Sequence, residues 1–234
     1  MNQYLPYLWE LRTRLLRGML VFFVLFLILF WQDASLYKIL ANPLLKHLPT
    51  GASLVATEVT SPFTIPLKLA LISAFFLAVP YFFYQLWSFI TPALYRREKH
   101  LFLPILIGSI CLFYMGALFS YFVICPLALK FFILNAPSYI SIMTDIRHYL
   151  DFILSLLLAG GLSFQVPVIT FILIRLEWVS IEKLTYLRPY IIVGAFVVAM
   201  FLTPPDVVSQ TLVAIPMWLL FEAGLLAAKW FKVN

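Results

Sequence analysis

Residues 189–221 read PYIIVGAFVVAMFLTPPDVVSQTLVAIPMWLLF. This stretch contains a single charged residue, Asp206, which directly follows Pro204 and Pro205. Proline has no backbone N–H, so it ends one helix and suits the first turn of the next. The stretch therefore predicts two membrane helices, about 190–203 and 207–227, joined by a tight turn.

The rest of the chain is equally apolar. Its mean hydropathy is +1.01 and 11% of its residues are charged, whereas about a quarter are charged in a soluble domain. Three charge-free runs each reach the roughly 20 residues that a helix needs to cross hydrocarbon, and an amphipathic N-terminal segment precedes a further span. We predict an all-α polytopic membrane protein with one domain, 1–234, and six spans at about 15–31, 68–92, 103–125, 151–174, 190–203 and 207–227.

The fifth predicted span is unusually short. About 13 residues separate Pro189 from Thr203, and at 1.5 Å per residue they reach roughly 20 Å, against a hydrocarbon thickness of about 30 Å. We expect the membrane to be locally thinner beside it.

The distribution of Lys and Arg predicts the orientation. Six spans put both termini on one side of the membrane, and that side carries eleven Lys and Arg residues against five on the other. The positive-inside rule then predicts cytoplasmic termini. The net charge of +6 is explained by contact with anionic lipid head groups, so no nucleic-acid partner is expected.

The residues that catalysis and metal binding require are not grouped in the sequence. All three histidines fall in predicted loops, and no two carboxylates pair inside a span. Cys111 and Cys125 share one span without C-x-x-C spacing. Because a nucleophile needs a neighbouring base and a metal needs several ligands, we expect no enzymatic activity, no metal and no cofactor.

Polar side chains inside the spans are candidate functional residues. Gln165 is one, although it can instead support a helix break at Pro167, whose ring removes a backbone hydrogen bond. Glu222 is another, although its position two turns before Lys229 also allows it to reach the cytoplasmic interface. The sequence leaves both alternatives open.

Two carboxylates on the basic cytoplasmic side need an explanation. Glu10 lies in YLWELRTRLL, residues 7–16, and Glu98 lies in YRREKH, residues 95–100. Glu10 can form an i,i+4 pair with Arg14, which contributes only about 0.3 to 0.5 kcal/mol. Glu98 can be a solvated loop charge worth roughly 0 to 1 kcal/mol. Composition alone does not decide between these roles and ligand binding.

Five segments, in order, make the chain resemble the TatC family of the twin-arginine protein translocation system. The resemblance covers nearly the whole chain. Its segments are YLWELRTRLL (7–16), SPFTIPLKL (61–69), YQLWSFITPALYRREKH (84–100), SFQVPV (163–168) and RPYIIVGAFVVAMFLTPPDVVSQTLVAIPMWLLFEAG (188–224).

The resemblance implies a ligand for the carboxylates. TatC proteins receive signal peptides with consecutive arginines on folded cargo, and the family's recognition residues match Glu10, Arg12 and Glu98, with Phe89 in a supporting position. A guanidinium forms forked, charge-assisted hydrogen bonds to a carboxylate, about 1.5 to 3 kcal/mol each, which lysine does not reproduce.

The resemblance also implies a concave, glove-like bundle without a closed pore, located in the bacterial inner membrane. Its partners would be TatA and TatB, with which it would oligomerise and support export driven by the proton-motive force. The positions that match the docking surface for these partners are Met200, Thr203 and Gln210. Other matched positions are Pro43 in the first outer loop and the acidic residues Asp206 and Glu222.

One position departs from the family. Members commonly carry glutamate where this chain has Gln165, so a titrating carboxylate at that depth is not available here. A neutral hydrogen-bonding role is retained, and a buried amide costs much less than a buried charge.

A secondary transporter or channel for a small solute is the alternative function. That class usually places ionisable groups near the midplane and repeats one half of the chain in the other. Here no such repeat is evident and the charges gather at the cytoplasmic rim. Solute or ion flux through liposomes that contain this subunit alone would distinguish the two functions.

Overall fold

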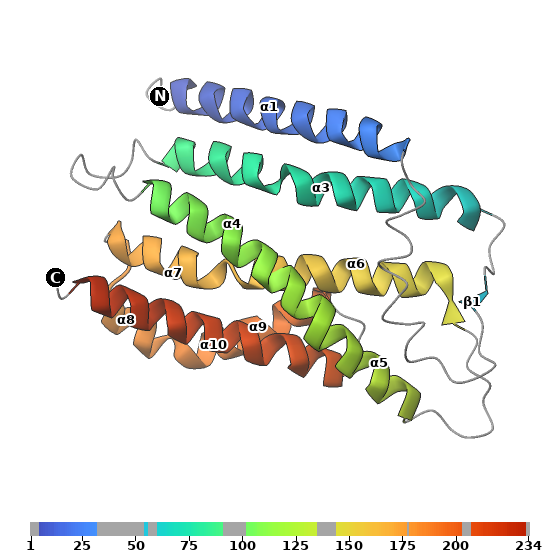
Figure 1. Ribbon diagram of the computed structural model, residues 1–234. Helices are drawn as coiled ribbons and strands as arrows, with labels where there is room; N and C mark the ends of the chain where they lie inside the picture. The colour runs from blue at the N-terminus through green and yellow to red at the C-terminus, as the bar shows by residue number, and fades with distance from the viewer. Residues whose placement is uncertain are drawn as a thin grey trace. The chain divides into compact units, whose positions relative to one another are not determined.

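A computed structural model describes residues 5–31, 54–55, 60–90, 102–134, 144–176, 178–202 and 207–232. The described chain is built of helices, with one pair of two-residue parallel strands (Figure 1). The elements are α1 (Leu5–Phe30), β1 (Leu54–Val55), α3 (Ser61–Ile90), α4 (Phe102–Phe119), the π-helical turn η3 (Ser120–Ile124), α5 (Cys125–Leu134), β2 (Thr144–Asp145), α6 (Ile146–Ser163), α7 (Val166–Arg175), α8 (Ile181–Tyr186), α9 (Arg188–Leu202) and α10 (Val207–Lys232).

The helices confirm the predicted all-α, multi-span fold. Among the described residues, five segments are long and apolar enough to cross a membrane: Trp9–Phe30, Phe63–Phe89, Phe102–Phe131, Ile146–Arg175 and Val207–Trp230. The sixth is the shorter apolar helix α9. Its 15 residues make it about 22 Å long, which agrees with a short fifth span.

The chain forms two compact units, one of residues 1–39 and 58–110 and the other of residues 40–57 and 111–234. In the first unit, α1 lies along α3 (Figure 1). Gly18 of α1 is buried, and a Cβ there would lie 2.8 Å from Cε1 of Phe82. Within the same unit, buried Trp87 donates its indole N–H to Ser109 Oγ at 2.9 Å. A small residue at the contact and a polar bond between spans are the usual means of helix association in lipid.

In the second unit, α6 packs on α4 and η3 through glycines. A Cβ on Gly160 would overlap Ser120 Oγ and lie 2.5 Å from the carbonyl oxygen of Gly116. Beside it, a Cβ on Gly161 would lie 2.6 Å from the ring of Phe113. Side chains at these glycines would therefore force the helices apart.

The predicted break at Pro167 is confirmed. Helix α6 ends at Ser163, and α7 begins at Val166 with the proline in its first turn. The Gln165 N–H turns back to the Leu162 carbonyl at 3.0 Å. At this break, α10 comes close, because a Cβ on Gly224 would lie 2.7 Å from Cα of Pro167.

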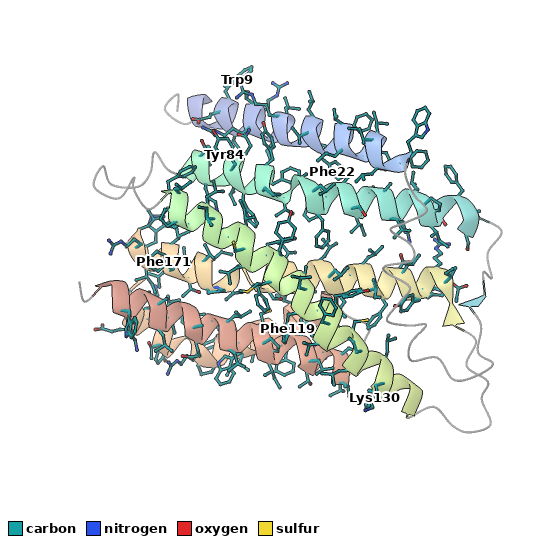
Figure 2. All side chains as sticks on the ribbon, viewed as in Figure 1. Trp9, Phe22, Tyr84, Phe119, Lys130 and Phe171 are labelled. Carbon is teal, nitrogen blue, oxygen red and sulfur yellow. The ribbon has the colours of Figure 1, made fainter. Side chains whose placement is uncertain are left out.

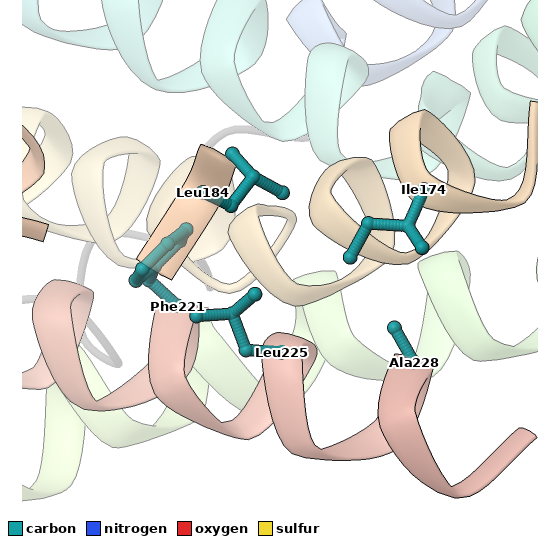
Figure 3. Packing of buried hydrophobic residues seen from close by; sticks show 5 residues of the cluster. All are labelled: Ile174, Leu184, Phe221, Leu225 and Ala228. Carbon is teal, nitrogen blue, oxygen red and sulfur yellow. The ribbon is translucent and has the colours of Figure 1, made fainter. Parts of the chain in front are cut away.

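The second unit also holds an apolar core between α7, α8 and α10 (Figure 3). Ser180 starts α8 by accepting a hydrogen bond from the Lys183 N–H at 3.2 Å. Leu184 of this short helix then packs in the core with Phe221 and Leu225 of α10. The core residues are Ile174, Leu184, Phe221, Leu225 and Ala228.

The glycine contact yields a stability prediction. Gly160→Ala should lower the free energy of unfolding by about 1 to 3 kcal/mol, the usual effect of overpacking, and thermal unfolding of the purified protein in detergent would measure it. Gly194→Ala is the matched control, because a Cβ there meets nothing within 4 Å. Equal unfolding temperatures for the two variants would contradict the packing account.

Candidate functional site

The candidate site begins with an ion pair on α1. Four residues separate Glu10 from Arg14, which puts both side chains on one helix face. The Glu10 Oε1 atom accepts hydrogen bonds from Arg14 Nε at 3.0 Å and from Nη2 at 2.6 Å. The Glu10 side chain is 41% exposed and the Arg14 side chain 22%. The carboxylate therefore already binds a guanidinium while it stays open to a ligand.

The Arg14 guanidinium also reaches the neighbouring helix α3. Its Nη1 lies 3.5 Å from Gln85 Oε1, and Gln85 Nε2 donates to the Tyr81 hydroxyl at 2.7 Å. Gln85 is buried. A polar network thus runs from Glu10 on α1 through Arg14 into α3.

A polar cavity and an apolar cleft meet at this network. Arg14 and Gln85 line both of them. The polar cavity, about 520 Å³, is lined in addition by Trp9, Glu10, Thr13, Arg17, Tyr84 and Ser88. The apolar cleft, about 220 Å³, is lined in addition by Leu11, Leu15, Phe82, Phe83, Leu86 and Phe89. Trp9 and Tyr84 mark the same end of α1 and α3 in Figure 2.

The predicted recognition residues fall into three groups. Glu10 and Phe89 are brought to the joined cavities. Arg12 is exposed, and its guanidinium lies over the Trp9 ring, 5.4 Å from the centroid. Glu98 lies outside the described residues, as do Pro43, Thr203 and Asp206.

The other described candidates all lie in the second unit. Gln165 is buried, 6% exposed, at the break between α6 and α7. Glu222 of α10 accepts a hydrogen bond from Arg188 Nη2 of α9 at 2.6 Å. Gln210 donates to the Phe196 carbonyl at 2.8 Å, while Met200 is 59% exposed. Two of these polar residues therefore join α9 to α10.

Gln85, one of the few polar side chains that the sequence places inside a span, lies in the site. Its signal was a lone amide in the charge-free run 69–95, but no spacing rule indicates its partner 71 positions away. The i,i+4 pair of Glu10 with Arg14, one of the alternatives that the sequence left open, is present. In the described part of the chain, no group of three or more His, Cys, Asp or Glu side chains could hold a metal ion.

Comparisons with known proteins point to one family. The model of the family Sec-independent protein translocase protein (TatC) matches residues 6–216. The TatC of Azotobacter chroococcum mcd 1 is 49% identical over 93% of this chain and 86% of its own length. The TatC of Haemophilus influenzae is 46% identical, with 97% and 89% covered. That of Escherichia coli K12 is 45% identical, with 97% and 88% covered.

Solved structures agree with the sequence relatives. A crystal structure of the twin arginine translocase receptor TatC superposes with a TM-score of 0.84 at 38% identity, over 96% of this chain and 98% of that one. A second, in the detergent DDM, gives a TM-score of 0.87 at the same identity. The fold and these matches define a multi-pass membrane component of a protein translocase. The chain belongs to the TatC family. Its role is one of transport.

The ion pair between α9 and α10 yields a prediction. Arg188→Gln and Glu222→Gln should each lower the free energy of unfolding by about 1 kcal/mol, because the pair is partly exposed. The charge-swapped double variant, Arg188→Glu with Glu222→Arg, should recover most of the loss in thermal unfolding in detergent. Glu182→Gln, which removes an exposed carboxylate on α8, is the control. If the swapped variant instead lost as much free energy of unfolding as the two single variants together, a stabilising pair would be excluded.

Proposed function

We propose that this protein is the receptor subunit of a twin-arginine translocase, and that Glu10 binds an arginine of the cargo signal. The observation that carries the proposal is the Glu10 carboxylate, which stands on a cavity, is 41% exposed and takes a guanidinium at two nitrogens. The solved receptor of the same family supports it.

The preference for arginine over lysine follows from geometry. A guanidinium presents several N–H donors in a rigid plane and contacts a carboxylate through two of them at once. Arg14 makes this forked contact with Glu10 inside the protein. An ammonium group is a point charge and satisfies the same oxygen with one donor. The carboxylate therefore discriminates between two cations of equal charge.

The apolar cleft accepts the segment that follows the arginines. It starts at Arg14 and Gln85 and is otherwise lined by aliphatic and aromatic side chains of α1 and α3. Apolar surface removed from water or from the head-group region contributes roughly 25 cal/mol per Å². An arginine at Glu10 and an apolar stretch in the cleft would thus bind together, with Phe89 as one wall.

Partner subunits dock on the α9 side of the second unit. Met200 on α9 is exposed, as are the apolar residues Val193 and Val197 of the same helix. We propose that single-span TatA and TatB helices lie against this surface and that the proton-motive force drives export. The membrane is the bacterial inner membrane, with both termini cytoplasmic, where arginine-bearing signals arrive.

Peptide binding tests the receptor role. A fluorescent synthetic signal peptide with Arg-Arg should bind the purified full chain more tightly than its Lys-Lys counterpart. Glu10→Gln and Glu98→Gln should each weaken Arg-Arg binding by about 10-fold to 150-fold, the equivalent of about 1.5 to 3 kcal/mol for a charge-assisted contact. Both substitutions should also reduce the arginine preference.

Glu182→Gln is the control in this experiment, because it removes an exposed carboxylate far along the chain in α8. It should leave binding unchanged. An arginine preference that survives in both Glu10→Gln and Glu98→Gln would refute carboxylate recognition by this subunit.

Crosslinking tests the docking surface. A photo-crosslinking residue at Met200 should capture TatA or TatB in native membranes, because this side chain faces outward from α9. The control is Leu219 of α10, which is 53% exposed. Equal capture at both positions would indicate random encounter in the membrane.

A further inference from the structure

We propose that Arg14 is an internal competitor for the carboxylate of Glu10, which a cargo arginine must displace before it binds. The inference rests on the proposed function and deepens it. It makes Arg14 an affinity-setting residue of the receptor, distinct from the residues that contact the bound signal.

Arg14 occupies the position on Glu10 that a cargo arginine would take. Its guanidinium makes the two-nitrogen contact with Glu10 Oε1 that an incoming arginine would need. Among the described residues, no other cation contacts this carboxylate: Arg12 lies over the Trp9 ring instead. A cargo arginine that makes the same two-nitrogen contact therefore competes with Arg14 for Oε1.

The displaced Arg14 has a second acceptor within reach. Its Nη1 already lies 3.5 Å from Gln85 Oε1, and Gln85 is held by its own hydrogen bond to the Tyr81 hydroxyl. The polar cavity of about 520 Å³ leaves room for the side chain to turn toward α3. Loss of the Glu10 contact does not leave the guanidinium without an acceptor, so the exchange is low in cost.

The expected effect is modest and uniform. A partly exposed i,i+4 pair of this kind lowers the affinity of any competitor by about two-fold to five-fold. Because the same pair must break for every ligand, Arg14 weakens Arg-Arg and Lys-Lys peptides by the same factor. The two-nitrogen contact at Glu10 sets the ratio of the Kd values for the two peptides. Arg14 raises the Kd of both peptides. A weakly binding signal therefore occupies a smaller fraction of the receptor at a given concentration.

The test measures the Kd of labelled Arg-Arg and Lys-Lys peptides for the purified full chain at physiological salt. Arg14→Gln should tighten both peptides by about two-fold to five-fold and leave their ratio unchanged. Arg17→Gln is the matched control, since Arg17 is exposed, lines the same cavity and makes no ion pair within the described residues. In the double variant Glu10→Gln with Arg14→Gln, the gain should disappear.

Three results would overturn the inference: weaker or unchanged binding in Arg14→Gln, an equal gain in Arg17→Gln, or a gain that persists without Glu10. The second would indicate general charge repulsion. A gain that disappears without Glu10 does not come from misfolding, which would raise non-specific binding in both backgrounds, so the readout remains valid if Arg14→Gln lowers stability. Failure of the proposed function looks different, because Glu10→Gln alone would then leave Arg-Arg binding unchanged.

Discussion

Hydrocarbon offers the peptide backbone no hydrogen-bond partner, and this constraint governs the rest of the structure. Each span must be a helix, because only a helix satisfies its own N–H and C=O groups. Burial of apolar side chains gives little drive for helix association, since lipid is equally apolar. Close approach is needed instead, and it occurs where side chains are absent, at Gly160 against Gly116 and at Gly224 against Pro167.

The same constraint accounts for the polar contacts. Trp87 bonds Ser109 in the first unit, whereas Gln210 and Glu222 bond groups on α9 in the second. Each contact joins two helices. Glu10 differs, because its partner Arg14 is on the same helix and both side chains line a cavity. Arg14 can therefore leave Glu10 without separating two helices.

Local rules predicted much of this structure from the sequence. Charge-free runs indicated long apolar helices, Pro167 indicated the broken helix, and i,i+4 spacing allowed the pair of Glu10 with Arg14. Contacts between distant segments were not predictable. Arg14 and Gln85 are 71 positions apart, and Arg188 and Glu222 are 34 apart. A helix that is apolar on every side carries little periodic signal to indicate which face meets which neighbour.

In the proposed function, recognition of arginine by a chain of net charge +6 requires short-range forces. At physiological salt the Debye length is about 8 Å, so exposed arginines such as Arg12 and Arg17 repel an incoming signal only weakly beyond that range. A forked contact to a carboxylate acts within hydrogen-bond distance and is screened far less. In the proposed function, the basic rim can therefore hold anionic lipid while the carboxylates bind the signal arginines. In the proposed exchange at Glu10, a cargo guanidinium replaces that of Arg14, so the gain in binding free energy at this carboxylate is smaller than the new contact alone would give, and the apolar cleft adds to it.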